Sequence, residues 1–113
     1  MRKVIIICAV LALTSCSSTK SLYSWYDSED ATYQYTKKGE QKNLEDAMKQ
    51  YQRVISKQKG LRKVVPPGAN AEYGFMLYKA GKHNEGIALL REEIRLYPES
   101  EVFISRIIKQ LEK

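Results

Sequence analysis

The side chains that could perform chemistry are few and widely spaced. His83 is the single histidine, and no cysteine or carboxylate pair accompanies it at the spacing that a metal ion needs, so we expect no metal site. No serine lies in a recognised nucleophile motif with a histidine base, and no glycine-rich phosphate loop occurs. Glu92 and Glu93 are adjacent and therefore lie on different faces of a helix, which argues against a catalytic pair. The sequence predicts neither an enzyme nor a cofactor.

The two cysteines, Cys8 and Cys16, both lie at the start of the chain. Two basic residues precede an uninterrupted apolar run over residues 4–13, and small polar residues then lead to Cys16, which is the pattern of a secretion signal. As a helix, this run rises about 15 Å, half of the roughly 30 Å of hydrocarbon that a permanent span must cross. We therefore expect a cleaved leader over residues 1–15 rather than a transmembrane anchor.

Leu13, Thr14, Ser15 and Cys16 resemble the lipobox of bacterial lipoproteins. In those proteins, processing enzymes attach diacylglycerol to the cysteine sulfur, cut the chain before it and usually acylate the new amino terminus. The resemblance implies a covalent lipid on Cys16 and a short polar tether over residues 16–21. An ordinary signal peptide with an incidental cysteine is the alternative. Without an Asp directly after Cys16 or an acidic run, the chain resembles lipoproteins of the outer membrane that face the periplasm.

Length and charge limit the rest of the chain. Its 113 residues leave room for one small domain, expected over residues 22–113. The formal charge is +6, but two basic residues lie in the leader, so the mature chain carries 17 basic and 13 acidic residues. Because this excess is mild and no nucleic-acid-reading motif appears, we expect no nucleic-acid partner.

Apolar residues recur at helical spacing along this domain. They predict an all-α fold with helices near residues 22–36, 43–58, 69–80, 84–97 and 100–112. The first helix is expected to carry Leu22, Trp25, Tyr26 and Tyr33 on one face, packed against the next helix or placed in the headgroup layer of the membrane.

Polar residues and glycines suggest where these helices begin and end. Asn43 and Asn84 are the expected N-caps of the second and fourth helices. Gly60 is the expected C-terminal stop of the second helix, and Gly81 lies in the turn between the third and fourth. The third and fourth helices should therefore be joined by a tight polar turn at Gly81, Lys82 and His83.

The third and fourth helices resemble a tetratricopeptide repeat. The matching positions are Tyr73, Gly74, Leu77, Gly86, Leu90 and Pro98. The chain departs from the pattern at Gly86, where the family prefers Ala, and at Glu93, which we expect to pair with a basic residue at the open edge of the hairpin. The resemblance implies tetratricopeptide-like antiparallel hairpins. The last helix is expected to cap them with one apolar face, formed by Val102, Phe103, Ile107, Ile108 and Leu111.

Two groups of residues are candidates for binding. In tetratricopeptide arrays the ligand lies against the first helix of each pair, and this pattern points to Phe75, Tyr78 and Lys79, although the two aromatic residues could instead be core. The second group lies around a proline-containing connector and is basic. Its members are Lys57, Lys59, Arg62 and Lys63. These side chains are expected to contact anionic lipid headgroups or an acidic partner, or else to form a solvated basic loop.

Three further stretches give a second resemblance, which covers nearly all of the mature chain. They are LYSWYD, VPPGANAEYG and REEIRLYPES, and with them the chain resembles a small family of bacterial lipoproteins, domain of unknown function 4810. Members of this family look like companions of outer-membrane lipoproteins related to the curli secretion channel. The resemblance implies a helical interaction scaffold in an envelope assembly, with other lipoproteins or an outer-membrane channel as partners. The alternative is a structural lipoprotein of envelope biogenesis whose basic loop binds lipid headgroups or cell-wall material.

Overall fold

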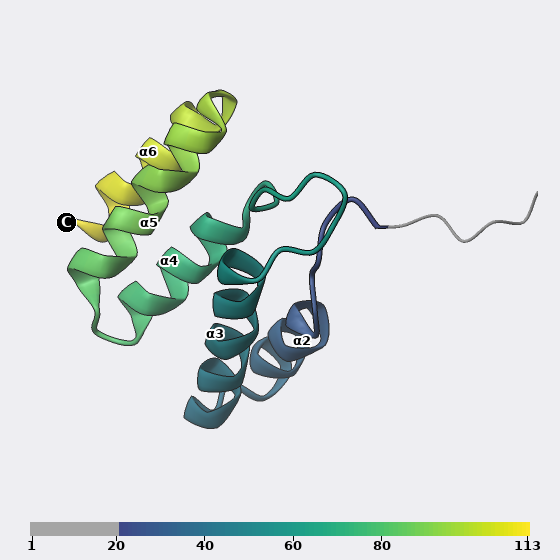
Figure 1. The fold of residues 1–113 in the computed structure, drawn as a ribbon. Coiled ribbons are helices and arrows are strands. Elements are labelled where there is room, and N and C mark those ends of the chain that lie inside the picture. Colours follow the sequence, from purple (N-terminus) through teal and green to yellow (C-terminus); the bar gives the residue numbers. More distant parts are fainter. Residues whose placement is uncertain (1–20) are drawn as a thin grey trace, which may run out of the picture.

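The computed structural model describes residues 21–113, so the predicted leader and Cys16 with its lipid lie outside the described residues. The described chain forms five α-helices and no strand (Figure 1). Their bounds are Ser28–Lys38 for α2, Gln41–Ser56 for α3, Ala69–Lys79 for α4, His83–Leu96 for α5 and Glu101–Leu111 for α6, with a short 3-10 turn at Pro98–Ser100. The predicted all-α fold with five helices is confirmed.

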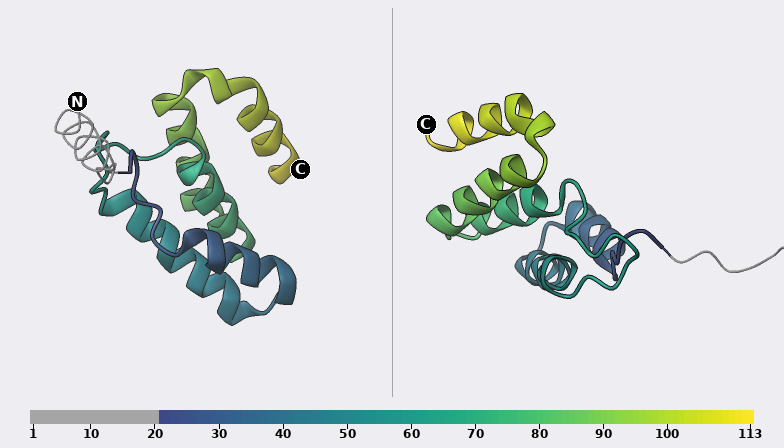
Figure 2. Two further views of the ribbon diagram at one scale, coloured as in Figure 1. Left: turned by 90° about the vertical axis from the view of Figure 1, so that its right-hand side faces the viewer. Right: turned by 45° about the horizontal axis from the view of Figure 1, so that its top comes forward.

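The helices pack in the order in which they occur along the chain. Helices α2 and α3 form one hairpin, α4 and α5 form a second with the largest interface, and α6 packs on α5 (Figure 2). The two hairpins meet where α3 contacts α4. Because each helix contacts mainly its neighbours in sequence, the described chain is a short stack of helices rather than a bundle around one axis.

Two apolar clusters hold this stack together. The first joins α2, α3 and α4, and its buried members are Leu44, Ala47, Tyr51, Val54, Ala69 and Met76. The second joins α5 and α6, and its buried members are Leu90, Ile104 and Ile108. Ala71 on α4 packs against this second cluster, so α4 lies between the two and contributes to both.

Helices α4 and α5 approach each other through two glycines. A Cβ atom added at Gly74 would lie 2.7 Å from the carbonyl oxygen of Gly86, and one added at Gly86 would lie 2.5 Å from the carbonyl oxygen of Gly74. Both distances are too short for any side chain. This contact explains why Gly86 stands where the tetratricopeptide pattern prefers Ala.

The turn between these helices also needs a glycine. Gly81 has φ +90°, and the amide groups of Gly81 and Lys82 donate to the carbonyl oxygens of Tyr78 (3.1 Å) and Leu77 (2.9 Å). This is the hydrogen-bond pattern of a Schellman motif, in which a left-handed residue ends the helix. The prediction for Gly81 is confirmed.

The first predicted helix begins later than expected. Residues 21–27 are not helical, and α2 begins at Ser28. The amide of Arg62 donates to the carbonyl oxygen of Leu22 (3.2 Å), so this segment pairs with the connector after α3 instead of coiling. Trp25 still packs against the first core cluster, as one of the two interpretations expected, whereas Leu22 and Tyr33 are exposed. The four residues therefore share no helical face.

Three of the predicted helix ends are also wrong. Helix α3 begins at Gln41 and α5 at His83, so Asn43 and Asn84 lie inside the first turns and do not cap them. Gly60 does not end α3, since the helix stops at Ser56 and Gly60 is buried further along against the backbone of Leu22. The preceding left-handed Gly39, with φ 66°, ends α2 and lets α3 start early.

Helix α6 buries part of the predicted face, since Val102 and Phe103 are not in it and Ile104 is. Ile104 and Ile108 are buried, with Ile107 and Leu111 packed beside them. Val102 and Phe103 are exposed. Because Ile104 and Ile108 are four residues apart, they define the buried stripe, and the two preceding residues are turned away from it. Helix α6 packs on α5 at the end of the stack, as predicted, but through a face that is rotated toward Ile104.

The glycine contact gives a test of the α4 and α5 packing. Gly86→Ala should lower the free energy of unfolding by about 1–3 kcal/mol through overpacking, although Ala favours a helix over Gly by roughly 1 kcal/mol. Urea unfolding followed by circular dichroism measures the change. The neighbouring exposed Glu85→Ala is the control and should change the stability little. A more stable Gly86→Ala protein would mean that the two helices lie further apart.

Candidate functional site

An apolar groove lies between α4 and α6. Its volume is about 380 Å³. Two phenylalanines line it, Phe75 on α4 with 38% of its surface exposed and Phe103 on α6 with 67% exposed. The other lining residues are Ala71, Glu72, Leu90, Ile107, Gln110 and Leu111. Two large aromatic side chains therefore border an apolar hollow on helices that the core holds in place.

A second hollow of about 370 Å³ extends the groove toward the start of α4. The two hollows share Ala71, Glu72 and Phe103, so they adjoin, and together they are called the groove. Glu99 also lines the second hollow, which places two carboxylates at this end together with Glu72. Near the other end, the ammonium group of Lys79 lies 5.2 Å from the centre of the Phe75 ring. The groove therefore combines apolar and polar lining residues, with Glu72 and Glu99 toward the start of α4 and Lys79 near the other end.

The three residues predicted to bind a partner have different surroundings. Phe75 and Lys79 are exposed and lie together beside the groove. The hydroxyl group of Tyr78 instead donates to the carbonyl oxygen of Leu111 (2.5 Å), and its ring stacks on His83 with 4.2 Å between the ring centres. Tyr78 therefore fastens the end of α6 to α4. Neither Phe75 nor Tyr78 is buried core, and the binding role of the three stays a prediction.

Glu93 has a structural role that the sequence did not reveal. Its side chain is only 2% exposed, and its Oε1 atom accepts a hydrogen bond from the amide of Gly68 (2.6 Å). The expected pairing with a basic residue is therefore wrong. Gly68 precedes α4, so the Glu93 carboxylate lies at the positive end of the α4 dipole, where a negative charge is stabilised. Glu93 on α5 thereby fixes the start of α4.

The connector between the hairpins is held at a second point. The hydroxyl group of Tyr97, at the end of α5, donates to the carbonyl oxygen of Val65 (2.6 Å). Burial, together with the neighbouring Tyr23, raises the pKa of Tyr97. Its hydroxyl, like that of an ordinary tyrosine, is protonated at neutral pH and can donate. Glu93 and Tyr97 therefore position the connector from the same helix.

The four basic residues of the predicted anionic-contact group all lie on this connector. Lys57, Lys59, Arg62 and Lys63 are exposed. The Arg62 guanidinium donates to the hydroxyl oxygen of Tyr23 (3.2 Å), and Lys63 has φ 52°, a left-handed conformation that turns the chain. The structure therefore brings all four onto one loop.

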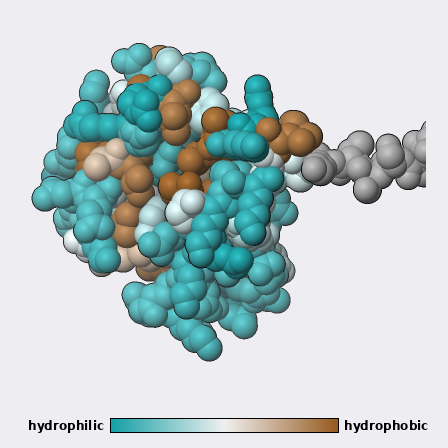
Figure 3. All heavy atoms as spheres, viewed as in Figure 1, coloured by the Kyte–Doolittle hydropathy of each residue, from teal (hydrophilic) through white to brown (hydrophobic). Residues whose placement is uncertain are grey.

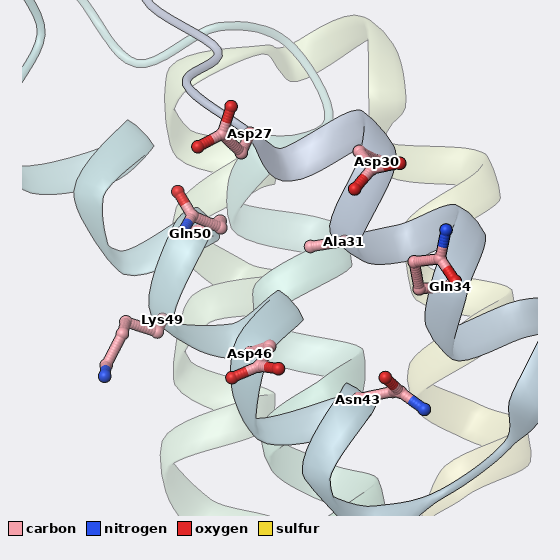
Figure 4. A pocket seen from close by; sticks show the side chains of 8 residues that line it. All are labelled: Asp27, Asp30, Ala31, Gln34, Asn43, Asp46, Lys49 and Gln50. Carbon is pink, nitrogen blue, oxygen red and sulfur yellow. The ribbon is translucent and has the colours of Figure 1, made fainter.

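A polar hollow of about 280 Å³ lies between α2 and α3 (Figure 4). Figure 4 shows Asp27 and Asp30 at the start of α2 and Asp46 and Gln50 on α3. Within residues 21–113, no group of three or more histidine, cysteine or carboxylate side chains is placed to hold a metal ion.

The candidate site includes residues that sequence reasoning missed. Phe103 was expected to be buried, and Glu93 was expected at an open edge. The sequence held no signal for Phe103, because Phe103, Ile107 and Leu111 have the same helical spacing as Ile104 and Ile108. For Glu93, the sequence shows a carboxylate where the repeat pattern has a small apolar residue. This indicates that the carboxylate needs a polar partner, but it does not identify the amide of Gly68.

Comparison with known proteins gives one match. The family model described as "Domain of unknown function (DUF4810)" matches residues 22–107, which extend from the segment before α2 into α6. No curated protein and no solved structure matches the chain. The tetratricopeptide-like character of the hairpins therefore stays a prediction. Among residues 21–113, no helix has the length and apolar character that crossing a bilayer requires.

The contact between Glu93 and Gly68 gives a second prediction. Glu93→Ala should lower the free energy of unfolding by about 2 kcal/mol, because the amide of Gly68 loses a charged acceptor. Glu93→Gln keeps an acceptor oxygen and should cost less. Urea unfolding measures both. Glu92→Gln is the matched control, because the Glu92 carboxylate lies on the exposed side, paired with Arg95, and should leave the midpoint nearly unchanged. Equal effects at the two positions would contradict the capping role.

Proposed function

The chain belongs to the family described as domain of unknown function 4810, and from that premise we propose that it is a lipid-anchored lipoprotein of the outer membrane that acts as a helical interaction scaffold. Its partner is another envelope lipoprotein or a channel, in the first place an outer-membrane lipoprotein related to the curli secretion channel. The proposal includes no catalytic activity and no cofactor other than the lipid on Cys16.

The groove between α4 and α6 is the observation that carries the proposal. Protein interfaces depend on a few anchoring side chains, with aromatic residues enriched among them, and these anchors lie in or beside hollows that exclude water. Phe75 and Phe103 have this arrangement. Both are on helices and lose little conformational freedom on binding, because the core already fixes their backbone. An apolar segment of the partner protein fits such a groove better than a small polar ligand.

The charges at the two ends of the groove support a preferred direction of binding. Glu72 and Glu99 lie at the end near the start of α4, and Lys79 lies near the other end. A partner segment with a basic residue at one end and an acidic residue at the other would match both charges. Such complementarity contributes mainly to specificity.

The lipid anchor is proposed from the lipobox resemblance. It keeps the chain at the membrane surface where outer-membrane lipoproteins are found, since two or three acyl chains hold a protein durably. A tether of residues 16–21 is short, so the groove would meet partners that are also bound to the membrane. The periplasmic leaflet is the proposed location.

Replacement of Phe103 tests the groove. Phe103→Ser should reduce co-purification of the curli-channel-related lipoprotein from detergent-solubilised membranes by about tenfold or more, because loss of one aromatic anchor costs roughly 2 kcal/mol of binding. The stability of the chain should change little, since Phe103 is already exposed. Quantitative mass spectrometry of the purified complex measures the ratio of partner to bait.

Val102→Ser is the matched control. Val102 is the neighbouring residue on α6 and is 67% exposed, as Phe103 is, but it does not line the groove. Lys79→Glu should resemble Phe103→Ser in binding and Val102→Ser in stability. Unchanged partner recovery with both Phe103→Ser and Lys79→Glu would exclude the groove as the binding site.

A further inference from the structure

The first described residues are fixed to the connector that follows α3. Residues 21–26 lie beside residues 57–62, with Tyr26 hydrogen-bonded to Lys57 and Ser24 to Lys59. The amide of Leu61 donates to the carbonyl oxygen of Ser21 (3.1 Å), and the amide of Arg62 donates to that of Leu22 (3.2 Å). The start of the described chain is therefore held beside the basic loop.

Side-chain hydrogen bonds strengthen this pairing. The Gln58 amide group accepts from the backbone amide of Ser24 (3.0 Å) and donates to its carbonyl oxygen (2.7 Å). The backbone amide of Lys59 donates to the Ser24 hydroxyl (3.0 Å). Gly60 is buried where the two segments cross, and a Cβ there would lie 2.3 Å from the carbonyl oxygen of Leu22. The geometry leaves the tether one fixed point of departure from the domain.

Exposed apolar residues surround this point. Leu22, Leu61 and Val64 are 54%, 57% and 49% exposed. They are three of the seven large apolar residues that the described chain exposes, and they come from two segments that lie side by side. Figure 3 shows hydrophobic residues at the surface next to the start of the described chain, with hydrophilic residues beside them. These side chains therefore form one local apolar group instead of lying singly on the surface.

The charge of the mature chain is concentrated at the same place. Lys57, Lys59, Arg62 and Lys63 lie between residues 57 and 64, and this stretch contains no acidic residue. The other mature residues carry thirteen basic and thirteen acidic side chains. The net charge of the mature chain therefore equals the charge of this one loop. The loop lies next to the three exposed apolar side chains.

We propose that this surface is a membrane face that rests on a bilayer containing anionic phospholipid. The membrane face consists of Leu22, Leu61 and Val64, which enter the headgroup layer, and Lys57, Lys59, Arg62 and Lys63, which contact phosphate groups. Apolar side chains flanked by lysine and arginine are the composition of surfaces that lie in the membrane interface. The inference rests on the proposed lipid on Cys16 and adds a fixed orientation of the domain to it.

The length of the tether supports this orientation. Five residues, 17–21, span at most about 17 Å, so a lipid on Cys16 keeps Ser21 close to the bilayer. The hydrogen bonds described above then keep the basic loop there as well. Helix α6 lies on the opposite side of the molecule from the start of the described chain (Figures 1 and 2). The groove that α6 borders is thus left open for a partner.

Lipid quenching of a fluorophore tests the membrane face. After processing, Cys16 is acylated and Cys8 is removed, so a cysteine introduced into the full chain carries the only free thiol. Leu61→Cys and the control Val102→Cys, both at exposed positions, are processed in cells, labelled with an environment-sensitive dye and added to preformed phosphatidylcholine vesicles that contain phosphatidylglycerol and a nitroxide-labelled lipid. We expect strong quenching at position 61 and little at position 102.

The electrostatic part is tested with the same protein. Quenching at position 61 should fall sharply in vesicles without phosphatidylglycerol and in the charge-reversed variant Lys57→Glu, Lys59→Glu, Lys63→Glu. Equal quenching at positions 61 and 102 would overturn the membrane face, as would quenching at 61 that is insensitive to both changes. A dye at position 61 that is shielded by the co-purified partner instead of by lipid would also overturn it and assign the face to protein binding.

Two outcomes separate this inference from the proposed scaffold function. If the chain does not co-float with vesicles in a density gradient, it lacks the lipid anchor. The membrane face is then overturned together with the anchor. A chain that shows the expected quenching but loses no partner with Phe103→Ser supports the membrane face and counts against the groove alone.

Discussion

The close backbone contact between Gly74 and Gly86 is the constraint on which the rest of the structure depends. It brings α4 and α5 into the largest interface of the described chain and sets how far apart their outer faces lie. Helix α6 then packs on α5 through Ile104 and Ile108, while Tyr78 ties the end of α6 back to α4. The width of the groove follows from these contacts, because α4 and α6 form its walls without packing fully against each other.

The same hairpin positions both proposed functional surfaces. From α5, Glu93 fixes the start of α4 and Tyr97 fixes the connector, and the connector in turn holds the first described residues beside its basic loop. The proposed membrane face therefore lies on the connector before α4, whereas the groove lies between α4 and α6, and α4 and α5 position both. A lipid-anchored scaffold needs this separation, because the surface that meets the bilayer is not available to a partner protein.

The sequence predicts the elements of this fold better than their ends. Helical periodicity identified the helices most securely where they bury an apolar stripe, as α3 and α6 do. Gly81 was recognised because a turn of this kind needs a left-handed residue. The first helix was predicted too long because the pairing of Leu22 with Arg62 is a contact across 40 residues, which local patterns do not encode. The sequence predicted Phe75 and Lys79 as binding residues but not Phe103. The exposure of Phe103 and the hydrogen bond of Glu93 depend on how α6 and α4 pack, which local patterns do not encode.

The most direct test of the scaffold is photo-cross-linking in intact cells from a benzoylphenylalanine introduced at position 103 in the groove, compared with one at the neighbouring position 102. If the groove receives an envelope partner, irradiation gives a discrete cross-linked product from position 103, in which mass spectrometry identifies an apolar segment of the curli-channel-related lipoprotein, and little or none from position 102. The same products from both positions, or cross-links from position 103 to lipid alone, would contradict the account.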